Sequence, residues 1–168
     1  MTEPLVITTE RLRMRPLSPE DFPHWKRFFE SEHSRFIGGP MKEDDAFNRI
    51  AGLIGDWAMN GFGHWSVESA TGEYLGRTGL DQPAGWVEPE LGWSFMPEAG
   101  GKGYATEAAA AVRDFERARL GVDEIVSYIH NDNAPSIRVA ERINAFADGA
   151  TEAPWPDHIV YRHPGAQA

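Results

Sequence analysis

The chain has 168 residues, of which 41% are hydrophobic and 25% charged, and we expect residues 1–168 to form a single domain. It contains no cysteine, which excludes disulfides, thiolate metal sites and a cysteine nucleophile. The formal net charge of −10 argues against a nucleic-acid partner, because binding to phosphates needs clustered cations. We expect no membrane partner, because no apolar run approaches 18 residues. The first residues lack the pattern of a secretory signal, which favours a cytoplasmic location.

The first third of the sequence predicts one strand followed by two helices. In ERLRMRPL, Leu12 and Met14 alternate with arginines, a period of two that is typical of a strand. Ser18 followed by Pro19 and two acids is a helix start. A second helix is predicted over residues 43–59, with apolar residues on one face.

The middle of the chain predicts three strands in the segments FGHWSVES, GEYLGRTGLD and GWVEPELGWSFMP. In the third segment, alternation turns Leu91, Trp93 and Phe95 to one face. Glu90 and Ser94 then point to the opposite face, together with Gly92.

The second half predicts a helix over 103–120, a strand in DEIVSYIH, a short helix in NDNAPSIRVAERIN and a strand from His158. Gly121 and Asn144 stand where left-handed residues end the two helices. The buried stripe expected for the longer helix is Ala105, Ala108, Ala109, Val112, Phe115 and Arg119. A strand–helix–strand order implies a parallel crossover, whereas the hairpin-like middle implies antiparallel pairs. The expected fold class is therefore α/β (α+β), a mixed sheet with helices on both faces.

The segment AGGKGYATEA places three glycines directly before a predicted helix start. Such a loop is a plain turn, a flexible tether or a phosphate cradle, because glycines let an anion approach the unpaired N–H groups of a helix N-terminus. Lys102 is its only cation. The loop matches neither the P-loop pattern nor the dinucleotide fingerprint, since Tyr104 follows Gly103 and Thr106 stands at the last glycine position of that fingerprint.

Two longer segments together resemble the GNAT superfamily of acetyl-CoA-dependent N-acetyltransferases. They are ELGWSFMPEAGGKGYATEAA and, further along, NDNAPSIRVAERINAF. The resemblance is strongest from Glu90 to Phe146, and the nearest branch is that of the ribosomal-protein N-terminal acetyltransferases. It implies a mostly antiparallel sheet that splays near the coenzyme and is flanked by about four helices.

The resemblance also implies how acetyl-CoA binds. In the family, a loop of the form Arg/Gln-x-x-Gly-x-Gly/Ala wraps the pyrophosphate of the coenzyme. Gly103 and Ala105 fill its last two positions, whereas Gly100 stands where arginine or glutamine is usual. The backbone of the splayed strand pairs with the pantetheine arm, and an N-x-x-S asparagine contacts the coenzyme. The residues expected at the coenzyme are Phe95, Met96, Gly101, Lys102, Gly103, Tyr104, Ala105, Thr106 and Asn133.

The chemistry implied is direct transfer of the acetyl group to an amine, without a covalent enzyme intermediate. Glu90 is the candidate base, directly or through water. Glu88, on the same face of the predicted strand, is the alternative, and a merely solvated carboxylate is the competing interpretation. Ser136 is the candidate proton donor to the coenzyme thiolate, although a serine at a helix start also caps the local backbone. Many family members use a tyrosine at the position of Ala140. The histidines show no metal spacing, so no metal site is expected.

The acceptor is expected to be a protein N-terminus or a small amine, and the acidic balance favours a cationic one. It would contact the two early helices and the loops near 36–41 and 85–89. An alternative function is an acyl-CoA-binding or sensing module without catalysis, since Gly100 and Ala140 both depart from the family pattern. The sequence leaves open whether the protein is a monomer or a homodimer.

Overall fold

The computed structural model describes residues 5–165 and contains one sheet of eight strands. The strands lie in the order β1-β2-β3-β4-β5-β6-β8-β7. Their bounds are β1 Ile7–Thr8, β2 Leu12–Pro16, β3 His64–Ser69, β4 Tyr74–Asp81, β5 Glu90–Phe95, β6 Ile125–His130, β7 Phe146–Ala147 and β8 His158–His163. The α-helices are α1 Phe22–Phe29, α2 Glu43–Asn60, α3 Tyr104–Leu120 and α4 Ala134–Arg142.

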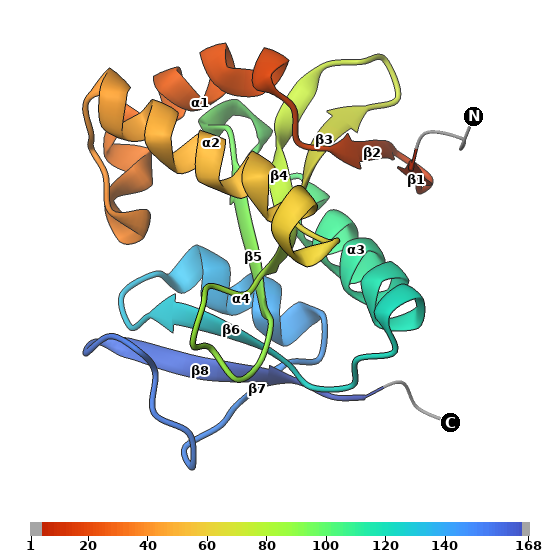
Figure 1. The fold of residues 1–168 in the computed structure, drawn as a ribbon, viewed down its shortest axis with the longest axis vertical. Helices are drawn as coiled ribbons and strands as arrows, with labels where there is room; N and C mark the ends of the chain where they lie inside the picture. Colours follow the sequence, from red (N-terminus) through yellow and green to blue (C-terminus); the bar gives the residue numbers. More distant parts are fainter. Residues whose placement is uncertain (1–4, 166–168) are drawn as a thin grey trace.

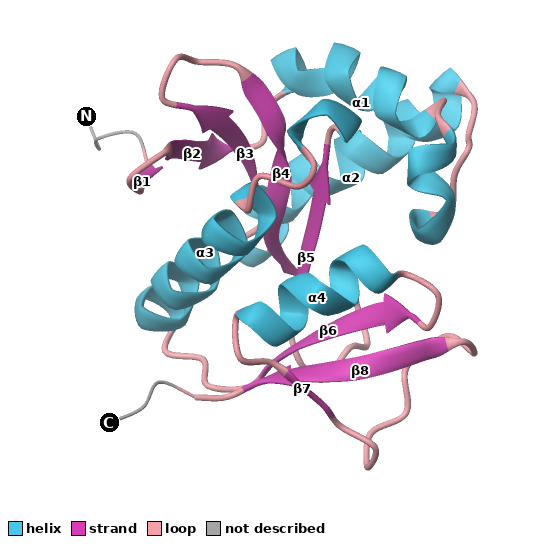
Figure 2. Cartoon of the chain, turned by 180° about the vertical axis from the view of Figure 1, so that it is seen from behind, coloured by secondary structure: helices cyan, strands magenta, loops and turns pink. Residues whose placement is uncertain are grey.

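The helices cover both faces of the sheet. Helices α1 and α2 lie on one face, and α3 and α4 lie on the other (Figures 1 and 2). Only β5 and β6 pair in parallel, joined by the crossover through α3, while every other neighbouring pair is antiparallel. The mixed, mostly antiparallel sheet predicted from the sequence is therefore confirmed.

Strands β5 and β6 separate almost as soon as they meet. Their register contains one residue pair, Glu90 opposite Val126. Beyond that pair the two strands run in clearly different directions, which divides the sheet into an upper and a lower half in Figure 1. One edge of β5 is therefore left without a partner strand.

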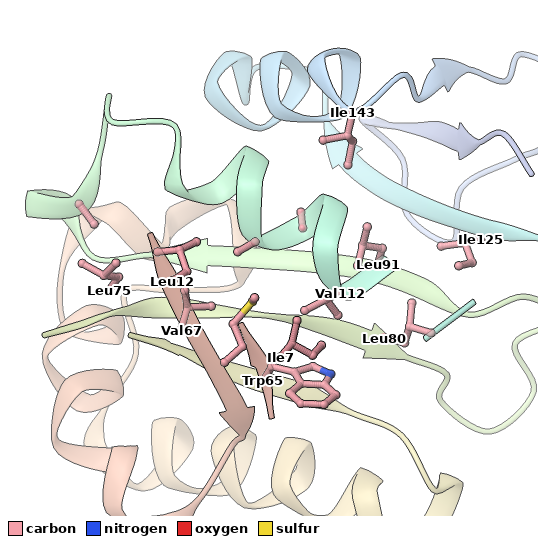
Figure 3. Close-up of a cluster of buried hydrophobic side chains, with 14 residues drawn as sticks. Ile7, Leu12, Trp65, Val67, Leu75, Leu80, Leu91, Val112, Ile125 and Ile143 are labelled. Carbon is pink, nitrogen blue, oxygen red and sulfur yellow. The ribbon is translucent and has the colours of Figure 1, made fainter. Parts of the chain in front are cut away.

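The main hydrophobic core lies between the sheet and α3 (Figure 3). Ala108, Ala109 and Val112 are fully buried there and pack in the same cluster as Leu91 and Trp65. Small alanine side chains let the helix axis lie close to the strands, as dense interior packing requires.

The expected stripe on α3 is wrong at its last position. Arg119 is exposed, and the buried residues on that turn are Glu116 and Arg117. Glu116 accepts a hydrogen bond from Trp65 Nε1 at 3.0 Å and pairs with Arg119 at 2.6 Å. A buried carboxylate with these two partners is satisfied, so it replaces the apolar residue that periodicity alone predicts.

The predicted helix ends are confirmed. Gly121 follows α3 with φ 66° and its N–H donates to the carbonyl of Arg117. Asn144 follows α4 with φ 65°. Both residues adopt the left-handed conformation that ends a helix and that glycine and asparagine tolerate best.

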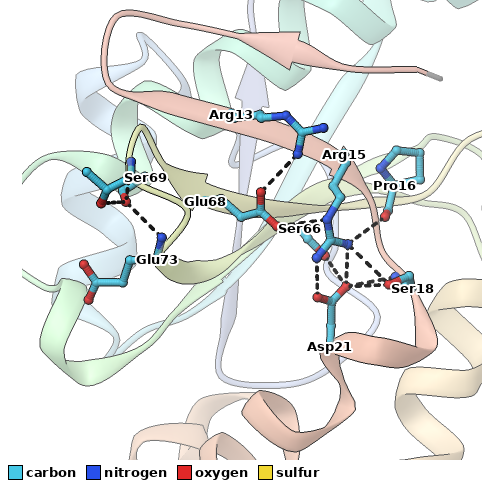
Figure 4. A network of polar contacts seen from close by, with 10 residues as sticks. Arg13, Arg15, Pro16, Ser18, Asp21, Ser66, Glu68, Ser69 and Glu73 are labelled. Carbon is cyan, nitrogen blue, oxygen red and sulfur yellow. Dashed lines mark hydrogen bonds and ion pairs between the residues drawn. The ribbon is translucent and has the colours of Figure 1, made fainter. Parts of the chain in front are cut away.

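The first predicted helix starts as a short 3₁₀ turn, Pro19–Asp21, before α1. Asp21 is buried and joins three elements (Figure 4). It accepts hydrogen bonds from Arg15 Nη2 at 2.7 Å, from Ser66 Oγ at 2.6 Å and from the N–H of Ser18 at 2.9 Å. Burial alone would raise the pKa of Asp21, but these donors hold it below its ordinary value.

Four short elements have no counterpart in the sequence-based prediction. They are β1, β7 and two 3₁₀ helices, over Glu32–Ile37 and Pro97–Ala99. Two residues of strand are too few to show a periodicity, so only pairing with a neighbouring strand defines them. Among residues 5–165, no helix combines the length and apolar content that crossing a bilayer requires.

The close packing of α3 gives a first prediction. Ala109→Leu adds three carbons where the side chain is 0% exposed, and should lower the free energy of unfolding by about 1–3 kcal/mol. Ala118→Leu is the matched control, because it makes the same change on the exposed face of the same helix. Urea titration of both variants measures the difference, and equal stabilities would contradict the packing described here.

Candidate functional site

A groove of about 390 Å³ runs from the glycine loop along α4. Gly101 and Gly103 have φ of 75° and 80°, a left-handed conformation that glycine adopts at no steric cost. Gly103 is the residue before the first turn of α3, whose N–H groups lack intrahelical partners. The groove is lined by Phe28, His33, Arg35, Phe36, Ile37, Trp93, Ser94, Phe95, Met96, Ala99, Gly100, Gly101, Gly103, Tyr104, Ala105, Thr106, Asn133, Pro135, Ser136, Arg138, Val139 and Arg142.

The positively charged side chains that line this groove come from outside the glycine loop. Lys102 turns away, because its Nζ donates to the carbonyl of Glu98 at 3.1 Å, and it is not among the lining residues. Arg35, Arg138 and Arg142 line the groove instead. The sequence-based selection missed all three. The two arginines of α4 could have been noticed there, because they lie four residues apart on one helical face.

Another arginine, Arg11, holds the glycine loop in place. Arg11 Nη1 donates to the carbonyl of Lys102 at 2.9 Å, and Arg11 Nη2 pairs with Glu107 at 2.6 Å. The same guanidinium lies 4.8 Å from the centre of the Tyr104 ring. Arg11 thus ties the start of β2 to the loop and to the first turn of α3, a contact between segments about 90 residues apart that no local pattern indicates.

The unpaired edge of β5 faces the gap toward β6. The N–H of Met96 donates to the carbonyl of Leu75 at 2.9 Å, so its backbone belongs to the β4 ladder. Because hydrogen-bonding direction alternates along an antiparallel strand, the backbone groups of Phe95 point the other way, into the gap. The side chain of Met96 is 1% exposed and packs in the cluster under α1.

A smaller cavity of about 110 Å³ lies on the α2 face of the sheet. Register places Asp81 opposite Glu90 and Arg77 opposite Ser94, so these four side chains share that face. Gly92 lies between Glu90 and Ser94 and leaves the floor of the cavity open. The lining residues are Phe36, Ile37, Arg49, Leu53, His64, Arg77, Asp81, Glu90, Leu91, Gly92, Trp93, Ser94, Ser127, Tyr128, Ile129, His130, Asn133 and Ser136.

Among the residues that line this cavity, Glu90 carries the carboxyl group whose pKa is shifted from its ordinary value. Burial raises its pKa to about 7, although the N–H of Tyr128 donates to Oε1 at 3.2 Å and lowers it in part. Asp81 raises this pKa further, while Arg77 and Arg49 lower it. A carboxylate with a pKa near neutrality is suited to accept a proton at physiological pH.

Glu88 differs from Glu90 in both position and partner. It lies before β5, lines neither cavity and pairs with Arg162 of β8 at 2.8 Å. The sequence-based expectation that Glu88 shares a strand face with Glu90 is therefore wrong, because the strand begins only at Glu90.

The two cavities meet beside the start of α4. Trp93, Ser94, Asn133 and Ser136 line both of them. Asn133 caps α4, since its Oδ1 accepts the N–H of Ser136 at 3.4 Å, and this leaves the hydroxyl of Ser136 at the junction. Ala140 is fully buried in the cluster under α4, so it offers no hydroxyl to either cavity.

Of the two loops expected to contact the acceptor, only one contributes residues to the cavities. Phe36 and Ile37 line both cavities, whereas residues 85–89 line neither. Helix α2 contributes Arg49 and Leu53 to the smaller cavity. Within residues 5–165, no group of three or more histidine, aspartate or glutamate side chains is arranged to hold a metal ion.

Comparison with known proteins matches residues 11–145 to the model of the acetyltransferase (GNAT) domain family. The chain belongs to this family. A crystal structure of an acetyltransferase from Agrobacterium tumefaciens is 34% identical, with a TM-score of 0.89 over 94% of this chain and 93% of that chain. The resemblance read from the glycine loop and the N-x-x-S element is thereby confirmed at the level of the family.

Further comparisons find the same fold in other solved structures and a partial sequence match to a curated protein. A spermidine N-acetyltransferase from Vibrio cholerae, solved with CoA and spermine, shares the fold at 17% identity, with a TM-score of 0.73 over 92% of this chain and 94% of that chain. A ribosomal-protein alanine acetyltransferase has the same fold. The uncharacterized N-acetyltransferase YnaD of Bacillus subtilis is 35% identical over 60 residues, 36% of this chain and 35% of the relative. The chain spans about a third to a half of the curated relatives that it matches.

The environment of Glu90 predicts a pH-dependent effect on stability. The pKa of Glu90 is about 7 in the folded protein, against an ordinary value of 4.5 that applies to the unfolded chain. The folded protein is therefore most stable at a pH low enough for this carboxyl to be protonated in both states. This stability is lost as the pH rises from about 4.5 through 7. The free energy of unfolding of Glu90→Gln should therefore match that of the wild type near pH 4.5 and exceed it by about 1–2 kcal/mol at pH 8.

Thermal unfolding at several pH values tests this prediction. Glu88→Gln is the control, because it removes a carboxylate that is paired with Arg162 and should bring no such gain. A constant difference between Glu90→Gln and the wild type across the pH range would contradict the assigned environment.

Proposed function

We propose that this protein transfers an acetyl group from acetyl-CoA to a primary amine by direct attack. The observation that carries the proposal is the meeting of two cavities at Ser94, Asn133 and Ser136, with Glu90 on the wall of the smaller one. The larger groove suits the coenzyme and the smaller cavity suits the amine. A reaction between the two would then occur at the junction, within reach of a carboxylate.

The residues of the larger groove fit a coenzyme with several phosphates. The unpaired N–H groups at the start of α3 and the positive end of its dipole favour an anion there. Gly101 and Gly103 give the anion close access to the backbone, and the guanidinium groups of Arg35, Arg138 and Arg142 add positive charge. The free backbone edge of β5 at Phe95 can pair with an extended amide-containing arm, as an added strand would.

The acetyl group is supplied as a thioester. In the proposed step a bond forms between the amine nitrogen and the carbonyl carbon while the bond from that carbon to sulfur breaks. Glu90 accepts the proton of the amine, directly or through water. Ser136 donates a proton to the departing sulfur and regains one from solvent. A backbone N–H on the free edge of β5 stabilises the negative charge that develops on the carbonyl oxygen.

The proposed base gives the first activity prediction. Glu90→Gln should lower kcat by roughly 10²–10⁴-fold with little effect on acetyl-CoA affinity, because the variant cannot accept a proton. In the wild type, kcat/KM should rise as the pH passes through about 7, and this rise should be absent in the variant. Release of coenzyme thiol over a broad panel of amines and N-terminal peptides measures both, since the chain contains no cysteine to react.

The outcomes separate the candidate functions. Retained turnover in Glu90→Gln together with its loss in Glu88→Gln would move the role to Glu88. Thermal stabilisation by acetyl-CoA without amine-dependent thiol release would favour a binding or sensing module. Absence of any stabilisation would rule out both coenzyme-dependent functions.

The cations of the groove give a second prediction. The double variant Arg138→Ala/Arg142→Ala should weaken acetyl-CoA binding by roughly 3–30-fold, because both side chains are exposed and their charge is partly screened. Lys102→Ala should change the affinity less than twofold, because its ammonium bonds the carbonyl of Glu98 away from the groove. Calorimetric titration compares them, and a larger loss in Lys102→Ala would contradict the proposed division of roles.

A further inference from the structure

The guanidinium of Arg77 is buried beside the proposed acceptor cavity without an ionic partner. The residue is 4% exposed and lines that cavity. Its Nη1 contacts Nδ1 of His64 at 2.7 Å, and its Nε has no hydrogen-bond partner. Within residues 5–165, no carboxylate forms an ion pair with Arg77.

The surroundings of Arg77 compensate its charge only in part. Its guanidinium lies 5.1 Å from the centre of the Trp25 ring, a favourable but modest interaction. His64 is fully buried, and burial and the two nearby arginines hold its pKa well below the ordinary value, so it is a neutral partner. Burial and the charge of Arg49 lower the pKa of Arg77 itself to about 10. A buried cation without a close anion is costly, which makes it a recognition element for an anion.

A second guanidinium enters the same cavity from the opposite side. Arg49 projects from the exposed face of α2 and lines the cavity, and within the described part of the chain it also forms no ion pair. Asp81 and Glu90 stand on the same wall as Arg77, but no oxygen of either lies within ion-pair distance of a guanidinium. The cavity therefore holds two guanidinium groups that form no ion pair, together with the carboxyl groups of Asp81 and Glu90.

From this arrangement we infer that the acceptor is a small amine that also bears a carboxylate, an amino acid rather than a polyamine, and that Arg77 and Arg49 bind its carboxylate. The inference rests on the proposed acetyl transfer and adds the class of acceptor. An acceptor bound in this way directs its amine toward Glu90, because the two guanidiniums hold its anionic end. A polyamine would bring further cations against two unpaired arginines, which like-charge repulsion disfavours.

The inference departs from what the composition suggests. A net charge of −10 favours a cationic acceptor over long distances. Inside a small cavity, however, the nearest charges dominate, because solvent screening removes the contribution of distant ones.

The test compares free L-amino acids with their carboxamides, which keep the amine but lack the carboxylate. The amine of a carboxamide is less basic, so more of it is unprotonated, and a preference for the acid must come from binding. We expect the wild type to prefer the acids by roughly tenfold or more in kcat/KM. Arg49→Gln and Arg77→Met should each bring this ratio close to one, with KM for the acids rising more than kcat falls.

Two controls keep the outcome interpretable. Arg13→Gln makes the same change in net charge on β2, away from both cavities, and should retain the wild-type ratio. Arg77→Met removes a buried group, so its melting temperature and its acetyl-CoA affinity are measured first. If it does not fold, the exposed Arg49→Gln decides the question alone.

Several results would overturn the inference. They are equal use of acids and carboxamides, a preference for spermidine, for N-terminal peptides or for an aminoalkyl phosphate, and an unchanged ratio in both variants. A role of Arg77 restricted to keeping Glu90 ionised would lower turnover equally for acid and amide, which also contradicts the inference. If no amine is turned over, the proposed function fails. The inference about the acceptor is then tested separately, by titrating each amino acid and its carboxamide into the coenzyme-loaded protein and measuring their binding. Binding of the acid alone would then support the inference, and equal or absent binding would overturn it.

Discussion

The divergence of β5 from β6 after a single residue pair is the constraint on which the site depends. A continuous sheet would use the backbone groups of Phe95 for a ladder and would fill the space beside Ser94 with side chains from β6. Separation leaves a free strand edge, opens the groove behind it and brings the start of α4 to the junction of the two cavities. Unsatisfied backbone groups on one edge are costly when buried, so they are stable only where solvent or a ligand can pair with them. The same feature that weakens the sheet thus leaves free backbone groups on the wall of the groove.

The two cavities use charge in different ways. In the groove, exposed arginines and helix N–H groups create a positive surface that a polyanion can approach without first losing much solvation. In the smaller cavity, Arg77 is buried and Glu90 is partly buried, and each shifts the pKa of the other. Burial makes the carboxyl a better base near neutrality and leaves the guanidinium without a neutralising anion. The substitution of Gly100 for the usual long polar side chain is compatible with this division, since a Cβ there would lie only 3.2 Å from the carbonyl of Pro97 and other cations already line the groove.

Much of the fold follows from local pattern. The strands of the central hairpins, the long helix α3 and the helix ends at Gly121 and Asn144 have clear periodicities or capping residues, and all of these were predictable. The errors occur where tertiary contacts override the pattern. Glu116 is buried because Trp65 and Arg119 satisfy it, and β1 exists because β2 lies beside it. In the site, the glycine loop could be found from its sequence, but Arg35 and Arg77 could not be selected, since nothing local distinguishes them from the other arginines of the chain.

The sequence by itself determined the family, the glycine loop before α3 and the carboxylate at the start of β5. These features depend on residue type and short-range spacing, such as glycines that tolerate positive φ and an alternation that separates Glu90 from Leu91. Only the tertiary structure decided that Lys102 turns away from the groove, that Glu88 pairs with Arg162, and that Arg77 lies buried without an anion. Each of these depends on which distant strands and helices come together. Burial and charge pairing are properties of that assembly, and the same side chain would titrate and bind differently in another one.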